Sequence, residues 1–218
     1  MNATQHRWLV RLAMAVVFLI VITIWPLFRI IPLEQADRVS AEQTTRFDAS
    51  EFVQQFWTDS LLPSKKHATD AEELIRAIET DPATAKAKYG RSVGLSTAYH
   101  YFVSGAGRVV RIERNSIGIA IDAESDAAQI VLETGPVFGN VIRDGTGLLD
   151  VNDFANSRDF NAVSGVINRR VESEVLPELK SYAAPGAWIL FVGCARISDE
   201  ETDLAPMRVI PFDVETRK

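Results

Sequence analysis

Residues 99–122 read YHYFVSGAGRVVRIERNSIGIAID, and they show most clearly which kind of fold to expect. Apolar residues alternate here with polar or small ones, which is the pattern of a half-buried β-strand. The alternation predicts strands at Tyr99–Ser104, Arg108–Arg114 and Ile117–Asp122. Gly105-Ala106-Gly107 is expected to form a bulge or tight turn between the first two strands. The folded domain should therefore be built mainly from antiparallel strands.

More strands and one long helix are predicted towards the C-terminus. Strand patterns occur at Gln129–Glu133, Val137–Arg143, Leu148–Val151, Ala187–Ile197 and Met207–Val214, and a turn is predicted at Asp144–Gly147. Between them, apolar residues recur every three or four positions, at Phe160, Val163, Ile167, Val171 and Val175. This spacing predicts a helix over about 157–180, which Pro177 should end or kink.

Helix start signals precede the strands. The segments Asp48-Ala49-Ser50-Glu51 and Thr69-Asp70-Ala71-Glu72 match capping boxes, and Phe47 is placed to pack on Phe52 as a hydrophobic staple. Asp81-Pro82 is typical of the start of a third, short helix, because Asp caps and Pro suits the first helical position. These signals predict a helical segment before the first strand.

The expected fold class is α+β. Residues 1–33 are assigned to a cytoplasmic tail and transmembrane anchor, 34–95 to a juxtamembrane and helical segment, and 96–218 to a β-rich domain with the long helix. The order of antiparallel strands, one long helix and two more strands is that of an OB-like antiparallel β-barrel. A curled or open sheet with the helix across one face would give almost the same pattern.

The anchor is predicted from Leu12–Phe28, which holds 17 residues without a charge. A helix of that length is about 25 Å long, close to the thickness of the hydrocarbon core of a bilayer. Arg7 and Arg11 precede this segment, so the positive-inside rule places the N-terminus in the cytoplasm. We therefore expect a single-pass protein of the bacterial inner membrane with its C-terminal domain in the periplasm. Cleavage of a signal peptide after Ala41 is the alternative, although that site lies far from the apolar segment.

Charge and composition exclude several functional classes. The chain has a net charge of −6, and residues 34–218 carry 20 basic and 29 acidic side chains because the first 33 residues hold three arginines and no acid. An acidic domain does not have the basic surface of a nucleic-acid-binding protein. His6, His67 and His100 are scattered, so neither a metal site nor a cofactor is predicted. Cys194 lies in an apolar strand and is expected to be a buried thiol.

Polar residues between Gly139 and Asn168 form the candidate ligand-binding site. The candidate side chains are Arg143, Asp144, Asp153, Phe154, Asn156 and Asn168. Charged and amide groups beside an aromatic ring would suit a sugar or another polyol. The alternative is structural: Asp153 or Asn156 caps the long helix, and Arg143 pairs with a carboxylate.

The same stretch carries a resemblance to a known family. The shared motifs are Tyr89-Gly90, Gly105-x-Gly107-x-Val109, Gly139-x-x-Ile142-Arg143-Asp144-x-x-Gly147, Asp153-Phe154-x-Asn156, Val166-Ile167-Asn168 and Phe191-Val192-Gly193. These motifs occur in the same order over residues 48 to 200. By them the chain resembles bacterial predicted periplasmic lipoproteins of unknown function, which are often encoded beside sugar ABC transporters. The resemblance implies a periplasmic location and a link to sugar uptake, but no activity. A lipoprotein has an acylated cysteine after its apolar segment, and this chain has none there, so a transmembrane helix would replace the lipid.

Three functions remain open from the sequence. The first is a non-enzymatic, membrane-anchored binding or accessory module, with a small polar ligand or an ABC transporter subunit as its partner. The second is a carbohydrate-active hydrolase that uses Asp144, Asp153 or Asp159, which requires two carboxylates at a defined separation across a cleft. The third is a structural protein of the envelope.

Overall fold

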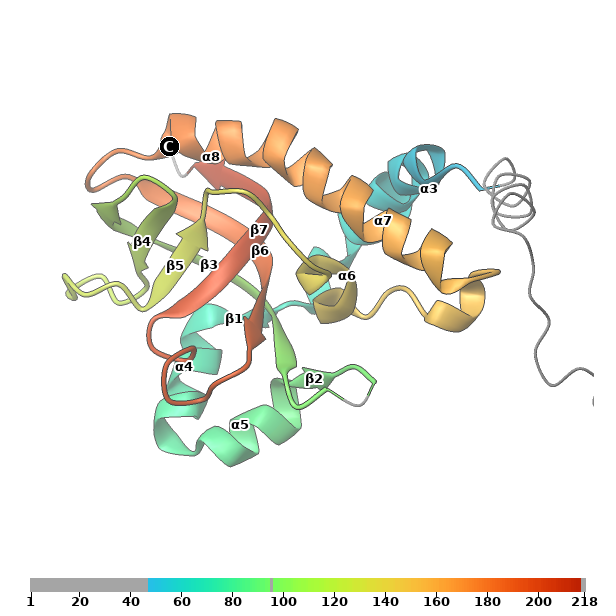
Figure 1. Ribbon diagram of the computed structural model, residues 1–218. Coiled ribbons are helices and arrows are strands. Elements are labelled where there is room, and N and C mark those ends of the chain that lie inside the picture. The colour runs from blue at the N-terminus through green and yellow to red at the C-terminus, as the bar shows by residue number, and fades with distance from the viewer. Residues whose placement is uncertain (1–46, 95, 217–218) are drawn as a thin grey trace, which may run out of the picture. The chain divides into compact units, whose positions relative to one another are not determined.

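The computed structural model describes residues 47–94 and 96–216 (Figure 1). The described residues all belong to one compact unit, Phe47–Lys218. The predicted anchor at 12–28 and the predicted juxtamembrane residues up to 46 lie outside the described residues. Within the described part of the chain, no helix combines the length and the hydropathy that a membrane crossing requires.

Five strands close into a barrel. They are β3 (Tyr99–Ile112), β4 (Ser116–Ala120), β5 (Ile130–Glu133), β6 (Trp188–Ile197) and β7 (Met207–Thr216). Neighbours in the barrel follow the order β3-β4-β5-β7-β6, and β6 pairs back onto β3. All these pairs are antiparallel except β5 with β7, which is parallel. Two short strands, β1 (Thr69–Asp70) and β2 (Arg91–Ser92), add to β3 outside this ring. The strands predicted near residues 117, 129, 187 and 207 are thereby confirmed.

The prediction of two strands joined at Gly105-Ala106-Gly107 is wrong, because β3 runs through this segment without interruption. The glycines are needed for close packing rather than for a turn. A Cβ atom on Gly107 would lie 2.4 Å from the carbonyl oxygen of Ala120, and one on Gly105 would lie 2.7 Å from the Cβ of Ala71. The register irregularity of β3 lies later, between Val109 and Arg111. Small residues here let β3 pair with β6 along ten positions and close the barrel.

The strands predicted at Val137–Arg143 and Leu148–Val151 are also absent. The first segment is a loop followed by the helix α6 (Val141–Thr146), and the second leads into a 3-10 turn at Val151–Asp153. Gly147 ends α6 in the left-handed conformation with φ 63°, where the predicted turn would have ended. Ile142 is 1% exposed because α6 packs on the outer side of β6 and β3. This tertiary packing outweighs the local strand pattern.

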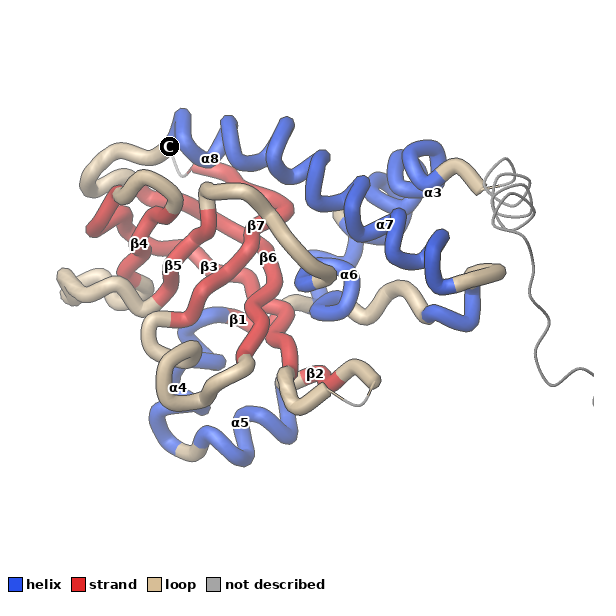
Figure 2. Tube along the Cα trace, viewed as in Figure 1, coloured by secondary structure: helices blue, strands red, loops and turns tan. Residues whose placement is uncertain are grey.

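The long helix is confirmed as a continuous helical segment of three parts: α7 (Ser157–Arg170), a π-helical turn (Val171–Val175) and α8 (Leu176–Tyr182). It lies along one side of the barrel (Figure 2). Its predicted apolar stripe is buried from Val163 to Val175, whereas Phe160 is only partly buried. Pro177 does not end the helix. It lies in the first turn of α8, directly after the π turn, where its missing N–H group is tolerated.

Among the described residues, three α-helices precede the barrel: α3 (Ala49–Phe56), α4 (Ala71–Thr80) and α5 (Pro82–Tyr89). A π-helical turn (Trp57–Leu61) and a 3-10 helix (Pro63–His67) lie between α3 and α4. The N-caps of the three α-helices are Asp48, Asp70 and Asp81, whose carboxylates accept backbone N–H groups of the first turns. The predicted cap at Thr69 is therefore displaced by one residue to Asp70. The Phe47 and Phe52 rings lie 5.6 Å apart, which confirms the staple.

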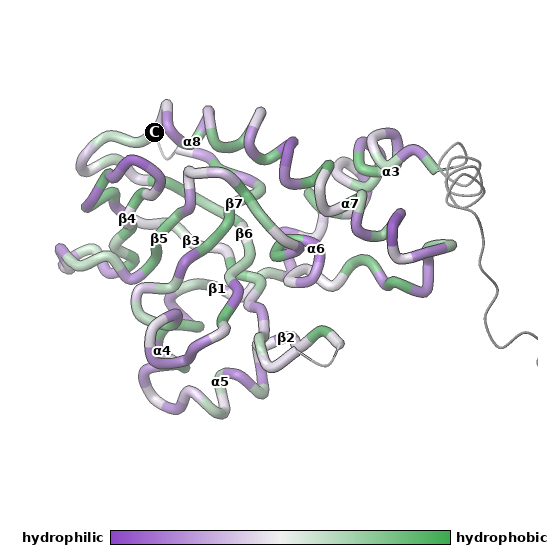
Figure 3. The backbone as a smooth tube through the Cα atoms, viewed as in Figure 1, coloured by the Kyte–Doolittle hydropathy of each residue, from purple (hydrophilic) through white to green (hydrophobic). Residues whose placement is uncertain are grey.

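One hydrophobic core includes residues from both the helical segment that ends near residue 95 and the β-rich part of the chain that follows it. Trp57 and Leu61, which follow α3, and Leu74 of α4 are at most 4% exposed and belong to the same core as the inner side of the barrel. Figure 3 shows the hydrophobic colouring concentrated on the strands, while the helices carry both colours. The helices that follow residue 47 are therefore part of the same folded unit as the barrel.

Candidate functional site

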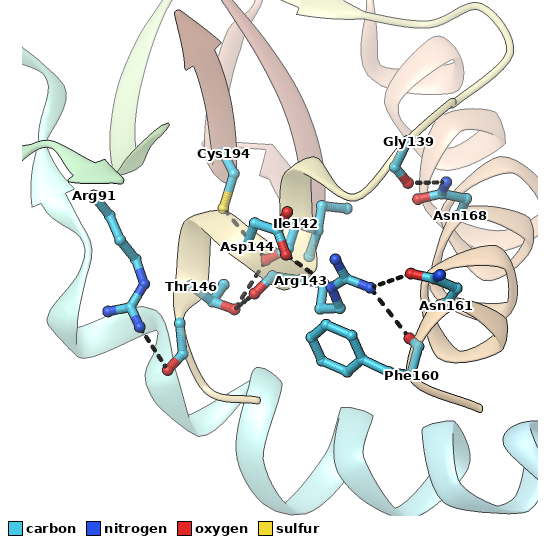
Figure 4. A network of polar contacts seen from close by, with 11 residues as sticks. Arg91, Gly139, Ile142, Arg143, Asp144, Thr146, Phe160, Asn161, Asn168 and Cys194 are labelled. Carbon is cyan, nitrogen blue, oxygen red and sulfur yellow. Dashed lines mark hydrogen bonds and ion pairs between the residues drawn. The ribbon is translucent and has the colours of Figure 1, made fainter. Parts of the chain in front are cut away.

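Arg143 is buried between α6 and α7 (Figure 4). Its Nε donates to Oδ1 of Asp144 over 2.7 Å, and its Nη1 donates to the carbonyl of Phe160 over 3.2 Å and to Oδ1 of Asn161 over 3.1 Å. The guanidinium carbon also lies 3.7 Å from the centre of the Phe160 ring. The side chains of Arg143 and Asp144 are 5% and 13% exposed. The contacts of Arg143 with Phe160 and Asn161 fasten α6 to α7. The burial of Arg143 and Asp144 leaves little of either group for a ligand.

Asn156 and Asn168 also have structural partners. Asn156 caps α7, since its Oδ1 accepts the backbone N–H of Asp159 over 2.9 Å, and its Nδ2 donates to the Asp159 carboxylate over 2.9 Å. Asn168 donates to the carbonyl of Gly139 over 2.9 Å and so holds the loop before α6. These contacts match the structural alternative that was open from the sequence.

Asp153 and Phe154, in contrast, line an open groove beside α3. The groove has a volume of about 400 Å³, which lies in the range of small-molecule sites. Its polar and aromatic lining consists of Phe52, Gln55, Phe56, Asp59, Ser60, Asp153 and Phe154, and Leu148 and Leu149 also line it. We call it the α3 groove. The sequence interpretation missed the α3 side, because nothing local links residues 52–60 to residues 148–154.

The aromatic side of the α3 groove is held by ring packing. The Phe154 ring lies 5.7 Å from Phe47, 5.4 Å from Phe52 and 5.2 Å from Phe160, with tilted or edge-on geometries. Phe52 stacks on Phe56 with an interplanar angle of 9°. Such pairs each add about 0.5–1.5 kcal/mol beyond the area that they bury. The rings are therefore fixed before any ligand enters.

The polar side of the α3 groove carries two carboxylates, Asp59 and Asp153. Asp153 is exposed and accepts the backbone N–H of Asp150 over 3.3 Å, as part of a capping box at the 3-10 turn. That contact uses Oδ2 and leaves Oδ1 free to accept from a ligand hydroxyl. Of the three carboxylates proposed for a hydrolase, only Asp153 lines this groove.

Another groove, of about 490 Å³, lies between α4 and the loop after β4. Its α4 wall includes the exposed ion pair of Glu72 and Arg76, and no aromatic ring lines it. Volume alone does not make a ligand site. The α3 groove combines aromatic, acidic, amide and hydroxyl groups, and it includes two residues singled out from the sequence.

Two titratable groups, Cys194 of β6 and His100 of β3, are buried where α6 packs on the barrel. Burial raises the pKa of the Cys194 thiol, which donates weakly to the carbonyl of Ile142 at 3.9 Å, so the thiol stays protonated and unreactive. This confirms the expectation of a buried thiol. Burial also lowers the pKa of His100, whose Nδ1 has no hydrogen-bond partner among the described residues. A Cβ atom on Gly145 would lie 2.7 Å from the Cβ of Cys194, so only glycine lets α6 approach this closely.

Comparison with known proteins agrees with this architecture. The crystal structure of an OB-fold protein from Thermotoga maritima superposes with a TM-score of 0.69 at 25% sequence identity, covering 78% of this chain and 99% of that chain. The expectation of an OB-like barrel is thereby confirmed. A comparison with curated proteins gives no match. The family model described as "Predicted periplasmic lipoprotein (DUF2291)" matches residues 18–215, nearly the whole chain. The chain belongs to this family of predicted periplasmic lipoproteins.

Proposed function

We propose that the chain is a membrane-tethered, extracytoplasmic binding module that holds a small polyol, such as a sugar, in the α3 groove. One observation carries the proposal: fixed aromatic rings and carboxylate, amide and hydroxyl groups line the same recess of about 400 Å³. Aromatic faces cover the apolar side of a sugar ring, while the polar groups orient its hydroxyls. Phe154 and Phe52 would supply the first kind of contact, and Asp153, Asp59 and Gln55 the second.

The proposed module binds its ligand without converting it. A glycosidase needs two carboxylates in defined positions on either side of the scissile bond. Asp144 is engaged by Arg143, and Asp159 is engaged by Asn156 at the start of α7. The hydrolase built on Asp144, Asp153 and Asp159 is therefore less well supported than binding. A purely structural envelope role would leave the α3 groove without a use.

The family assignment supports a location outside the cytoplasm. Within that assignment we propose that residues 12–28 span the inner membrane once and leave the barrel in the periplasm. The 18 residues from 29 to 46 reach at most about 60 Å when extended, so the barrel would stay close to the bilayer. Such a tether raises the effective concentration of the module near a membrane partner. A subunit of a sugar ABC transporter is the partner that we propose.

A thermal-unfolding screen of the full-length chain in detergent tests the ligand class. Monosaccharides, disaccharides and sugar alcohols would be added one at a time. A ligand at 100 times its dissociation constant stabilises the folded state by about 2.7 kcal/mol, which gives a clear shift. Phe154→Leu and Asp153→Asn should remove the shift, whereas Glu79→Gln, which changes a carboxylate of the α4 groove, should keep it. Equal shifts in all three variants would place the ligand elsewhere.

A further inference from the structure

A second surface lies where the loop from β5 to α6 passes over β7 (Figure 1). Phe138 in this loop is 78% exposed, the highest value among the large apolar side chains that the structure describes as exposed. A single exposed apolar residue needs no explanation by itself. Phe138, however, is presented by a fixed loop beside a recess with a free positive charge.

Two contacts from α7 and the π turn hold this loop, one on each side of Phe138. The backbone N–H of Val137 donates to Oε1 of Glu172 over 2.6 Å, and the carbonyl of Gly139 accepts from Asn168 over 2.9 Å. The Val137 side chain is itself 7% exposed. The backbone on both sides of the ring is thus held before any partner arrives, which reduces the entropy lost on binding.

The recess has a volume of about 210 Å³ and an apolar floor. Pro136, Val137 and Val141 come from the loop and the start of α6, and Ile210 comes from β7. Phe138 follows Val137 directly in the chain but does not itself line the recess. A recess of this size accommodates one apolar side chain of a partner rather than a whole small molecule.

The charged rim of the recess is unusual for this chain. Arg208 donates to the Glu133 carboxylate over 2.5 Å, whereas Arg196 is exposed and has no carboxylate within 4 Å among the described residues. The chain beyond residue 33 has nine more acidic than basic side chains, yet this rim has two guanidinium groups and one carboxylate. An unpaired guanidinium is suited to bidentate binding of a carboxylate.

We propose that this surface docks an acidic segment of a partner protein. An apolar side chain of the segment fills the recess, an Asp or Glu beside it pairs with Arg196, and Phe138 packs on the partner as an aromatic anchor. Aromatic and Arg side chains are the residue types that dominate binding energy at such interfaces. A lipid surface fits less well, because the recess is concave and takes a single side chain.

The test is site-specific photo-crosslinking in cells that naturally make the chain. The photoreactive residue p-benzoylphenylalanine replaces Phe138 in the full-length chain, and Ile112, which is 47% exposed, is the control position. The expected result is one protein adduct at position 138 and none at position 112. Mass spectrometry should find Asp or Glu within a few residues of the crosslinked site on the partner.

Two variants test whether binding of the partner requires the positive charge of Arg196. Arg196→Glu should lower the adduct yield about tenfold, as expected for the loss of a charge-assisted hydrogen bond, whereas Arg196→Lys should keep most of it. Phe138 and Arg196 are both exposed, so replacing them should not change the midpoint of thermal unfolding. The proposal is overturned by a lipid adduct, by an adduct with a second copy of this chain, by no protein adduct at position 138, or by a yield that Arg196→Glu leaves unchanged.

Discussion

At the residue scale, Arg143 illustrates how a polar side chain can suggest a ligand site and yet serve the fold. Its neighbours Asp144, Phe160 and Asn161 satisfy the guanidinium within a solvent-excluded junction of two helices. The sequence shows only that Arg, Asp and Asn are close along the chain. Whether such groups face water or one another depends on how α6 packs on the barrel, which no local pattern reveals.

Arg143→Ala should therefore destabilise the fold. It leaves the Asp144 carboxylate in the junction without its partner, and removing one member of a buried ion pair lowers the free energy of unfolding by about 3–5 kcal/mol. Denaturant unfolding followed by tryptophan fluorescence measures this. Arg158→Ala, at an exposed position in the first turn of α7, should change the free energy by less than about 0.5 kcal/mol. Equal, small effects of both substitutions would mean that the junction is not structural.

His100 should make stability depend on pH. Burial, with the charge of Arg196, lowers the pKa of the folded-state imidazole, and the Asp144 charge and the Arg91 backbone oppose this only in part. The unfolded state therefore takes up a proton near pH 6.5, whereas the folded state does so only at lower pH. Stability from the neutral imidazole is complete above about pH 6.5 and is lost as the pH falls towards the folded-state pKa. The loss of unfolding free energy from pH 7.5 to 5.5 should be larger for the wild type than for His100→Gln; a larger loss in the variant would contradict this.

At the scale of elements, strands and caps follow from local rules, and exceptions arise where distant contacts dominate. Strand-like sequence patterns predicted β4, β5, β6 and β7, and carboxylate caps predicted the helices that begin after Asp48 and Asp81. The six-residue helix α6 escaped prediction because its few apolar residues match a strand equally well. Gly105 and Gly107 suggested a turn, but they are small because β4, β6 and α4 pack closely there.

The buried stripe of the long helix gives a test at this scale. Ile167 is 1% exposed, so Ile167→Asp buries a carboxylate in the core and should lower the free energy of unfolding by more than about 4 kcal/mol. Ala162→Asp puts the same group on the exposed side of α7 and should leave the fold intact. Far-ultraviolet circular dichroism during thermal unfolding distinguishes them. A stable Ile167→Asp variant would show that the helix faces the barrel with another side.

At the scale of the whole molecule, the candidate site is assembled from parts that are distant in the chain. Residues 52–60 and 148–154 meet only because α3 packs on α7 beside the barrel. The sequence predicted Asp153 and Phe154 as candidates, and the structure brings both to one groove. It assigns Arg143, Asp144, Asn156 and Asn168 to internal contacts. The function that we propose on this basis is that of an extracytoplasmic binding module tethered to the membrane.

The most direct test of that claim is a methyl NMR titration of the full-length chain in detergent micelles, with leucine methyl groups labelled and the same panel of sugars and sugar alcohols added. Leu148 and Leu149 line the α3 groove, whereas Leu190 lies on β6 and is not among its lining residues. The account predicts saturable shifts of the Leu148 and Leu149 methyl signals for at least one compound, with Leu190 unchanged. Signals of Leu148 and Leu149 that stay fixed throughout the panel would contradict the proposal that the α3 groove binds a small polyol.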